Sequence, residues 1–235
     1  MLDARARRDQ CEPCAALDRS ASVAADTVPG DPRPYAVYLA SFGVGLHKVG
    51  ITSAARGGLR LLEQAAVCSA FLGEGPLMTA RRTEAVLGAA LRLPDRVRDT
   101  AKRAARHQLP PTAERRAELA ALYAEAAGLR DRLPEALRLR PFQYDDHTAS
   151  FGLDADPPPS APASAISELV PGGALVGTVT VAAGHDLVVD APSGAVLLDT
   201  RLTCGWPLAR SSSSPGAPFP STPAPRSTPP PQPLF

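Results

Sequence analysis

The strongest constraint on the fold comes from two short apolar segments that flank a glycine-containing turn. Residues 35–40 are almost entirely apolar and include two tyrosines, and residues 46–51 form the second segment. Residues 41–45 between them read Ser-Phe-Gly-Val-Gly. Aromatic and branched apolar residues favour strands, whereas glycine favours turns. The sequence therefore predicts a β-hairpin here.

Helical periodicity follows the predicted hairpin. Thr52 or Ser53 can cap a helix, because apolar residues recur at helical spacing beyond them. Pro94 ends a later helix, since proline does not continue a helical hydrogen-bond ladder. The elements expected after the hairpin are a short helix, a strand at 67–72, a helix at 77–91, a basic helix at 95–107 and a packing helix at 112–133.

The spacing of apolar residues changes to that of strands in the last third of the chain. Short strand-like runs at 174–181, 187–190 and 195–201 are separated by turn residues. We expect an α+β fold with a small sheet and flanking helices, followed by a helical segment and a small C-terminal β-meander. The expected parts are a Cys-containing lead-in at 1–34, the core at 35–150, a linker at 151–165, the β-meander packing on the core at 166–206, and a disordered Pro/Ser tail at 207–235.

Composition sets broad limits on the class of protein. Of the 235 residues, 44% are hydrophobic, so the chain can bury a core. No apolar run approaches the ~20 residues that a membrane helix needs. The first ten residues are charged and have no apolar signal-peptide segment. We therefore expect a cytoplasmic protein that does not interact with membranes.

Charge is distributed unevenly, although the formal net charge is only +1. Residues 78–116 are rich in Arg and Lys, whereas residues 141–200 contain neither and hold several acids. A basic region beside an acidic one indicates an anionic partner such as nucleic acid. The same charge distribution is expected for two solvated faces, or for two halves of the chain that pair with each other. On charge alone, these interpretations are slightly favoured over an anionic partner.

The cysteines and histidines do not form a recognisable metal site in the sequence. Cys11 and Cys14 have the spacing of zinc ligands, but a structural zinc site needs about four ligands and no second pair follows. We therefore favour no zinc at these residues. No Gly-rich phosphate loop and no Ser-His-Asp order is present.

Four residues on successive predicted elements form the candidate site. Tyr38 lies on the first strand, Lys48 on the second, Arg60 on the first helix and Glu84 on the next. This order resembles the GIY-YIG nuclease superfamily. The matching strings are Ala36-Val37-Tyr38, Lys48-Val49-Gly50-Ile51-Thr52 and Arg60-Leu61-Leu62-Glu63-Gln64, followed by Glu84.

The sequence also resembles a bacterial family, the domain-of-unknown-function family 2797 in its actinobacterial form. The strings that carry this resemblance are residues 37–40, 48–52, 63–66 and 81–84. It extends from about Cys11 to Trp206.

The resemblance implies a site for phosphodiester chemistry. Tyr38, Lys48, Arg60 and Glu84 are its candidate catalytic residues, and Glu84 is the candidate ligand for Mg²⁺ or Mn²⁺. The candidate phosphate-binding residues are Lys48, Gly50, Thr52, Arg60 and Arg81.

Two departures from the superfamily pattern leave the activity open. Lys48 stands where the second motif has Tyr, and Gln64 stands where the helix has His. The first hypothesis is a nucleic-acid-binding protein that acts as a metal-dependent endonuclease. The second is a non-catalytic binding module that has lost these proton-transfer groups, and the third is a protein-interaction role of the β-rich end. These residues also have structural interpretations in place of a functional role. Tyr38 would be a core residue, and Arg60 and Glu84 would form an ion pair between helices.

Overall fold

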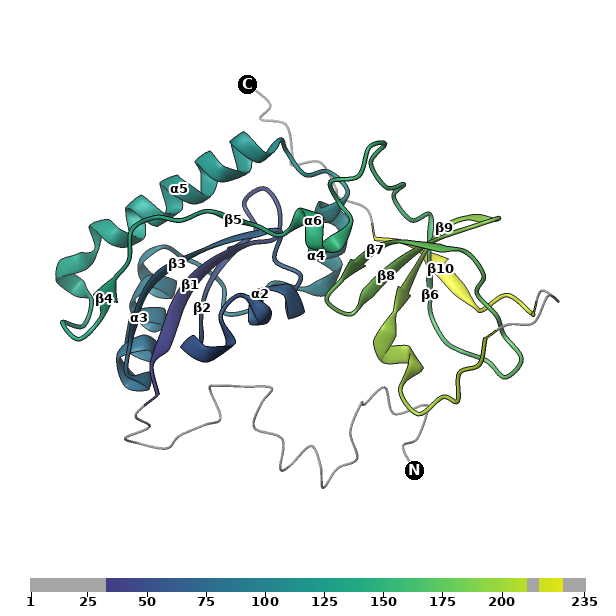
Figure 1. Cartoon of the computed structure of the whole chain (residues 1–235), viewed down its shortest axis with the longest axis horizontal. Coiled ribbons are helices and arrows are strands. Elements are labelled where there is room, and N and C mark those ends of the chain that lie inside the picture. The colour runs from purple at the N-terminus through teal and green to yellow at the C-terminus, as the bar shows by residue number, and fades with distance from the viewer. Residues whose placement is uncertain (1–32, 211–215, 226–235) are drawn as a thin grey trace. The chain divides into compact units, whose positions relative to one another are not determined.

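The chain folds as a mixed α+β protein with two β-sheets (Figure 1). The α+β class is the one that the sequence predicts. A computed structural model describes residues 33–210 and 216–225. The described residues divide into two compact units. We call them the α/β unit, which holds most of residues 33–147, and the sheet unit, residues 148–224. Each unit is described separately.

The sheet of the α/β unit is antiparallel and is built around its first strand, which is buried along its whole length. The order of its main strands is β2-β1-β3-β4, and β5 also pairs with β3. The predicted hairpin is confirmed, with Tyr38 opposite Gly50 in its register. The strands are β1 (Tyr35–Ser41), β2 (His47–Ser53), β3 (Cys68–Gly75), β4 (Arg138–Leu139) and β5 (Asp145–Asp146).

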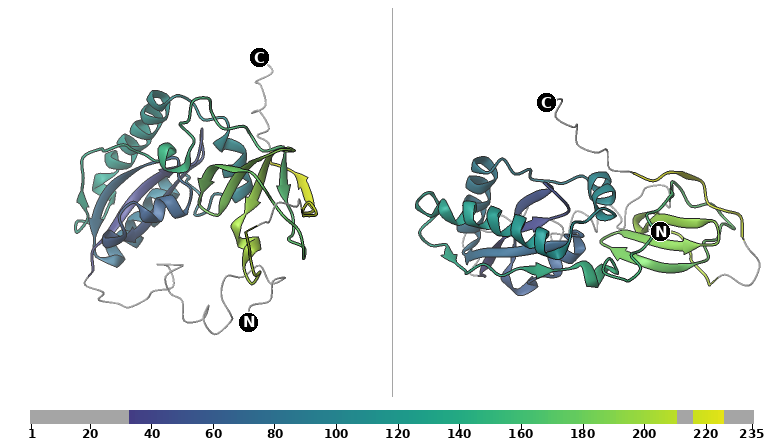
Figure 2. Two further views of the ribbon diagram at one scale, coloured as in Figure 1. Left: turned by 45° about the vertical axis from the view of Figure 1, so that its right-hand side comes forward. Right: turned by 90° about the horizontal axis from the view of Figure 1, so that it is seen from above.

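Helices follow the strands, and α5 runs along the sheet (Figures 1 and 2). The basic helix begins at Asp99 rather than at residue 95, because Arg98 before it is extended. The packing helix expected at 112–133 ends earlier, at Gly128, because glycine weakens helices, and a short 3₁₀ turn follows it. The helical segments are η2 (Ala54–Arg56), α2 (Leu59–Glu63), α3 (Leu77–Ala90), α4 (Asp99–Arg106), α5 (Thr112–Gly128) and η3 (Arg130–Arg132).

Alternation along the strands gives the two faces of this sheet different partners. On one face, Tyr38 and Phe42 form a buried cluster with Leu61 of α2 and Val97 before α4. On β2, Val49 points opposite to its neighbours and lies near Gly88 of α3, so α3 covers the other face. Lys48 and Gly50 therefore share the α2 face, at the edge strand of the sheet.

The sheet unit has a five-stranded sheet in the order β10-β6-β9-β8-β7, whose strands are labelled in Figure 1. Strands β7 to β9 form the antiparallel meander that the sequence predicts, and β6 joins β9 in parallel. The elements are α6 (Thr148–Phe151), β6 (Ser164–Ile166), β7 (Thr178–Ala183), β8 (Asp186–Ala191), β9 (Gly194–Asp199), η4 (Thr200–Thr203) and β10 (Ser221–Pro223).

Two of these strands correct the expected organisation. Strand β6 extends out of the segment expected to be a linker, because its backbone pairs with β9. Strand β10 lies in the tail expected to be disordered, so that expectation is wrong for residues 221–223. Proline-rich composition conceals such a strand, since pairing at a sheet edge needs only alternate backbone groups. Cys11 and Cys14 lie outside the described residues.

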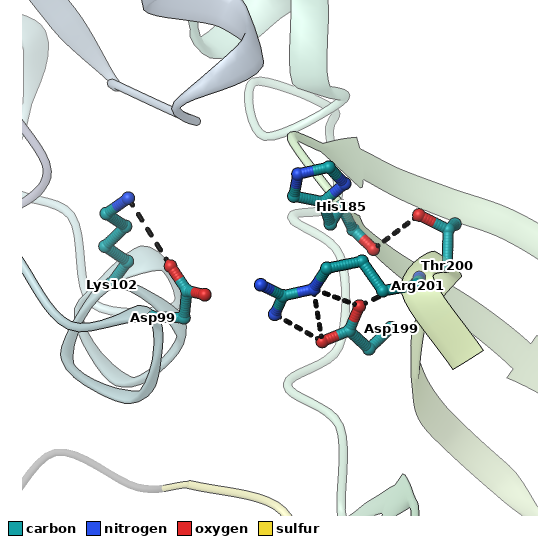
Figure 3. Close-up of polar contacts among 6 residues, drawn as sticks. All are labelled: Asp99, Lys102, His185, Asp199, Thr200 and Arg201. Carbon is teal, nitrogen blue, oxygen red and sulfur yellow. Dashed lines mark hydrogen bonds and ion pairs between the residues drawn. The ribbon is translucent and has the colours of Figure 1, made fainter. Parts of the chain in front are cut away.

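The 3₁₀ turn that follows β9 is fixed by a local ion pair, which Figure 3 shows. The Asp199 carboxylate accepts hydrogen bonds from the Arg201 backbone N–H at 3.0 Å and from Arg201 Nη2 at 2.6 Å. Thr200 Oγ1 donates to the carbonyl of His185 at 3.1 Å. These bonds join the end of β9 to the turn between β7 and β8.

Candidate functional site

Tyr38 and Gly50 are in direct contact across the hairpin. A Cβ atom added to Gly50 would lie 2.4 Å from Tyr38 Oη and 2.5 Å from Tyr38 Cζ. The phenol ring therefore lies against the Gly50 backbone. Gly50 is a candidate phosphate-binding residue in the sequence, and the structure places the Tyr38 side chain against it.

Tyr38 is a core residue of the α/β unit. Its side chain is 2% exposed and meets the Phe71 ring edge-on, with ring centroids 6.4 Å apart. Leu61 and Val97 complete its surroundings. The packing of Tyr38 is therefore that of a core residue. Its phenol oxygen is directed to β2, the edge strand that carries Lys48.

Lys48 lies within electrostatic range of both Arg60 and Glu84. Burial lowers the pKa of Lys48, the carboxylate of Glu84 raises it, and the positive charges of Lys102 and Arg60 lower it further. Burial also raises the pKa of Glu84, while the charge of Lys48 lowers it. Three residues that lie far apart in the sequence therefore share one half-buried charged region.

Thr52 and Arg81 take different places. Thr52 is 1% exposed, and its Oγ1 has no hydrogen-bond partner among residues 33–210 and 216–225. Arg81 lies one helical turn before Glu84 and lowers the pKa of that carboxyl. It also lines a hollow of about 490 Å³ with Arg82 and neighbouring residues. Arg81 thus belongs to the same charged region, whereas Thr52 is a buried residue of β2.

Two further members of this region were not identified from the sequence. Asp95 raises the pKa of Glu84, and Lys102 lowers that of Lys48. Lys102 lies over the Phe42 ring, with Nζ 4.7 Å from its centroid, and pairs with Asp99 at 3.5 Å (Figure 3). The basic composition of residues 95–107 indicated this helix but not which of its cations faces the site.

We call this set the Lys48 cluster. Its cations outnumber its carboxylates, so it favours an anion. Its members are Lys48, Arg60, Arg81, Glu84, Asp95 and Lys102.

The Lys48 cluster offers a magnesium ion at most two carboxylate ligands, those of Glu84 and Asp95. Within residues 33–210 and 216–225, no group of three or more His, Cys, Asp or Glu side chains is arranged to hold a metal ion. Mg²⁺ commonly binds one or two carboxylates and keeps several waters. Glu84, with Asp95 beside it, meets that smaller requirement.

A second polar group lies beside β3 and β5, across β1 from the strand that carries Lys48, and has a structural role. Arg115, which is 8% exposed, pairs with Asp146 at 2.7 Å and donates to the Pro110 carbonyl at 2.7 Å. Ser69 Oγ lies 2.9 Å from His147 Nε2. These bonds fasten α5 and the β5 segment to the sheet.

Together these features define a two-unit α+β protein with a half-buried cationic cluster at the edge of its first sheet. The chain belongs to the family described as Protein of unknown function (DUF2797), whose model matches residues 6–208. The match spans both units and ends before β10. No curated protein and no solved structure matches the chain. Among the helices that the structure describes, none is long and apolar enough to span a membrane.

Proposed function

We propose that the α/β unit binds the phosphate groups of a nucleic acid through the Lys48 cluster. The observation that carries the proposal is the crowding of cations at the edge of the sheet. Lys48 and Lys102 both have pKa values lowered chiefly by burial, and the charges of neighbouring cations lower them further. Partly desolvated cations held close together gain most from an anion that neutralises several of them.

A phosphate backbone matches this arrangement better than a single carboxylate does. Lys48 supplies a point charge, and Arg60 supplies a planar guanidinium that can bind phosphate with two parallel hydrogen bonds. Arg81 and the basic helix α4 extend the positive charge along the unit. A chain of phosphates can contact these groups in sequence.

The second candidate is metal-dependent cleavage of the bound phosphodiester. The observation that favours it is the effect of Asp95 on Glu84, because a divalent cation between the two carboxylates would relieve their repulsion. Glu84 would hold Mg²⁺ or Mn²⁺, which would polarise the phosphate. Lys48 and Arg60 would orient the phosphate, and the buried Tyr38 would support the strand beneath it. The sequence resemblance to GIY-YIG nucleases supports this candidate.

Binding and cleavage are tested with fluorescein-labelled single-stranded DNA, duplex DNA and RNA at low salt. Arg60→Gln removes a cluster cation, whereas Arg116→Gln removes an exposed cation of α5 and serves as the matched control. We expect Arg60→Gln to weaken binding about tenfold, which corresponds to ~1.4 kcal/mol for one charge-assisted hydrogen bond. Equal affinities for the two variants would refute the proposed site.

The same samples with Mg²⁺ or Mn²⁺ test cleavage. Product that depends on the metal and disappears in Glu84→Gln supports the second candidate. Intact substrate with unchanged binding restricts the function to the first.

A further inference from the structure

The segment at residues 216–224 lies along one edge of the sheet unit as an added strand. Strand β10 pairs antiparallel with β6, which is otherwise the edge strand. The Ser167 backbone N–H donates to the Pro220 carbonyl at 2.9 Å, and that of Ala224 donates to the Ala163 carbonyl at 3.1 Å. Main-chain bonds of this kind hold an extended peptide whatever its side chains.

A second contact holds the start of the segment. The Ala174 backbone N–H donates to the Ala217 carbonyl at 3.1 Å. A Cβ added to Gly173 would lie 2.3 Å from Phe219 Cε1, so the aromatic ring rests directly on the Gly173 backbone. Phe219 and the buried Ala224 are therefore the two side-chain anchors of the segment.

The rest of the segment is weakly held. Most residues between Phe219 and Ala224 are exposed, and a hollow of about 310 Å³ remains beside them. Its walls include Ile166, Leu175 and Val196 from the sheet unit. Because little apolar surface packs against the segment, it belongs to the part of the structure that opens at low cost.

We propose that the groove formed by β6 and residues 172–176 is a binding site for extended, uncharged peptides that carry Phe-Pro followed by Ser or Thr. Residues 216–224 of the chain are its resident occupant. A partner protein with such a segment adds as a strand to β6, seats its aromatic ring on Gly173 and displaces residues 216–224. The unfilled hollow leaves room for a larger apolar side chain in the partner.

Several features of the groove specify this chemistry. The backbone of β6 accepts a strand, and the ring site over Gly173 accepts an aromatic side chain. Prolines at 218, 220 and 223 carry no N–H, so they occupy positions where the chain needs no donor. No Asp, Glu, Lys or Arg is among the residues that line the hollow. A charged peptide would therefore find no counter-charge there.

A fluorescein-labelled synthetic peptide with the sequence of residues 216–225 tests this proposal on the full chain. Two forms of the chain are compared, the wild type and Phe219→Ala, whose own segment has lost its main anchor. We expect the peptide to bind Phe219→Ala at least about tenfold more tightly than the wild type, because a tethered segment competes at roughly millimolar effective concentration. Circular dichroism confirms that the variant keeps its fold.

The ring site is tested from the peptide side, where folding of the protein is not affected. A peptide with alanine in place of the phenylalanine should bind Phe219→Ala at least about tenfold more weakly than the original peptide. Equal affinity of the original peptide for the two chains, equal affinity of the two peptides, or no binding to Phe219→Ala at about 1 mM peptide would each overturn the proposal.

Discussion

Substituting Gly50 with alanine tests the contact that joins the hairpin to the core. The new Cβ would lie 2.4, 2.5 and 2.9 Å from Oη, Cζ and Cε2 of Tyr38, closer than Cβ atoms approach other heavy atoms in folded proteins. The ring cannot turn aside, because Leu61 and Val97 pack against it and are 0% and 5% exposed. The substitution therefore forces the strand and the ring apart.

The magnitude follows from two opposing contributions. Overpacking of a well-filled core costs ~1–3 kcal/mol, and this site lies toward the upper end because the atoms that the new Cβ meets belong to the rigid, buried side chain of Tyr38. Alanine in place of glycine recovers roughly 0.5–1 kcal/mol of unfolded-state entropy. We expect a net loss of about 2 kcal/mol, which lowers Tm by roughly 8 °C for a unit of this size.

Urea unfolding followed by helical circular dichroism measures this loss, since the long helices belong to the α/β unit. Gly128→Ala is the matched control. That glycine closes α5 with open space around it, so alanine there should raise stability by up to ~1 kcal/mol. In a Tyr38→Leu background, Gly50→Ala should cost at least about 1 kcal/mol less than it does alone. A change within ~0.5 kcal/mol for Gly50→Ala in the wild type would refute the reasoning.

Three further predictions concern charged and nucleophilic groups. Glu84→Gln should remove one contribution to the pH dependence of stability in mild acid. Burial raises the Glu84 pKa above that of the unfolded chain, so this carboxyl contributes stability at low pH that is lost as pH rises through the folded pKa. The urea midpoint of the wild type minus that of the variant should therefore fall as pH rises across that range, and a constant difference would contradict the prediction. Arg115→Met should cost ~3 kcal/mol, because it removes the cation that pairs with Asp146 and the donor to the Pro110 carbonyl and Thr112 Oγ1, whereas a loss under ~1 kcal/mol would contradict the structural role. Cys68 should be alkylated more than about tenfold more slowly than Cys204, since burial raises its pKa and Cys204 is partly exposed; site-resolved mass spectrometry at equal iodoacetamide dose measures both, and similar rates would show that Cys68 is accessible.

The sequence predicts the hairpin and its helices because their signals are local. Short runs of apolar and aromatic residues mark β1 and β2, and Pro94 marks the end of the helix before it. The start of α4 at Asp99 was predicted too early, because no capping residue distinguishes residues 95–98 from the helix. Strand β10 was missed since its signal is a pairing with residues far away in the chain.

The sequence predicts which residues to group into a candidate site, but it does not predict their burial or their neighbours. Lys48, Arg60 and Glu84 were grouped by their order along the chain, and the structure brings their charges together. The burial of Tyr38 against Gly50 follows from cross-strand register, which no local pattern specifies. Lys102 was hidden among several cations of one helix, because only the packing against Phe42 selects it.

The dependence of nucleic-acid affinity on salt tests the central claim most directly. Removing one phosphate-binding cation from the Lys48 cluster should reduce the slope of log affinity against log salt by roughly 1. Fluorescence anisotropy between about 50 and 200 mM salt should therefore give a shallower slope for Lys48→Met and for Arg60→Gln than for the wild type. Arg116→Gln should keep the wild-type slope. Slopes that are the same in all four proteins, or no binding at the lowest salt, would contradict the account.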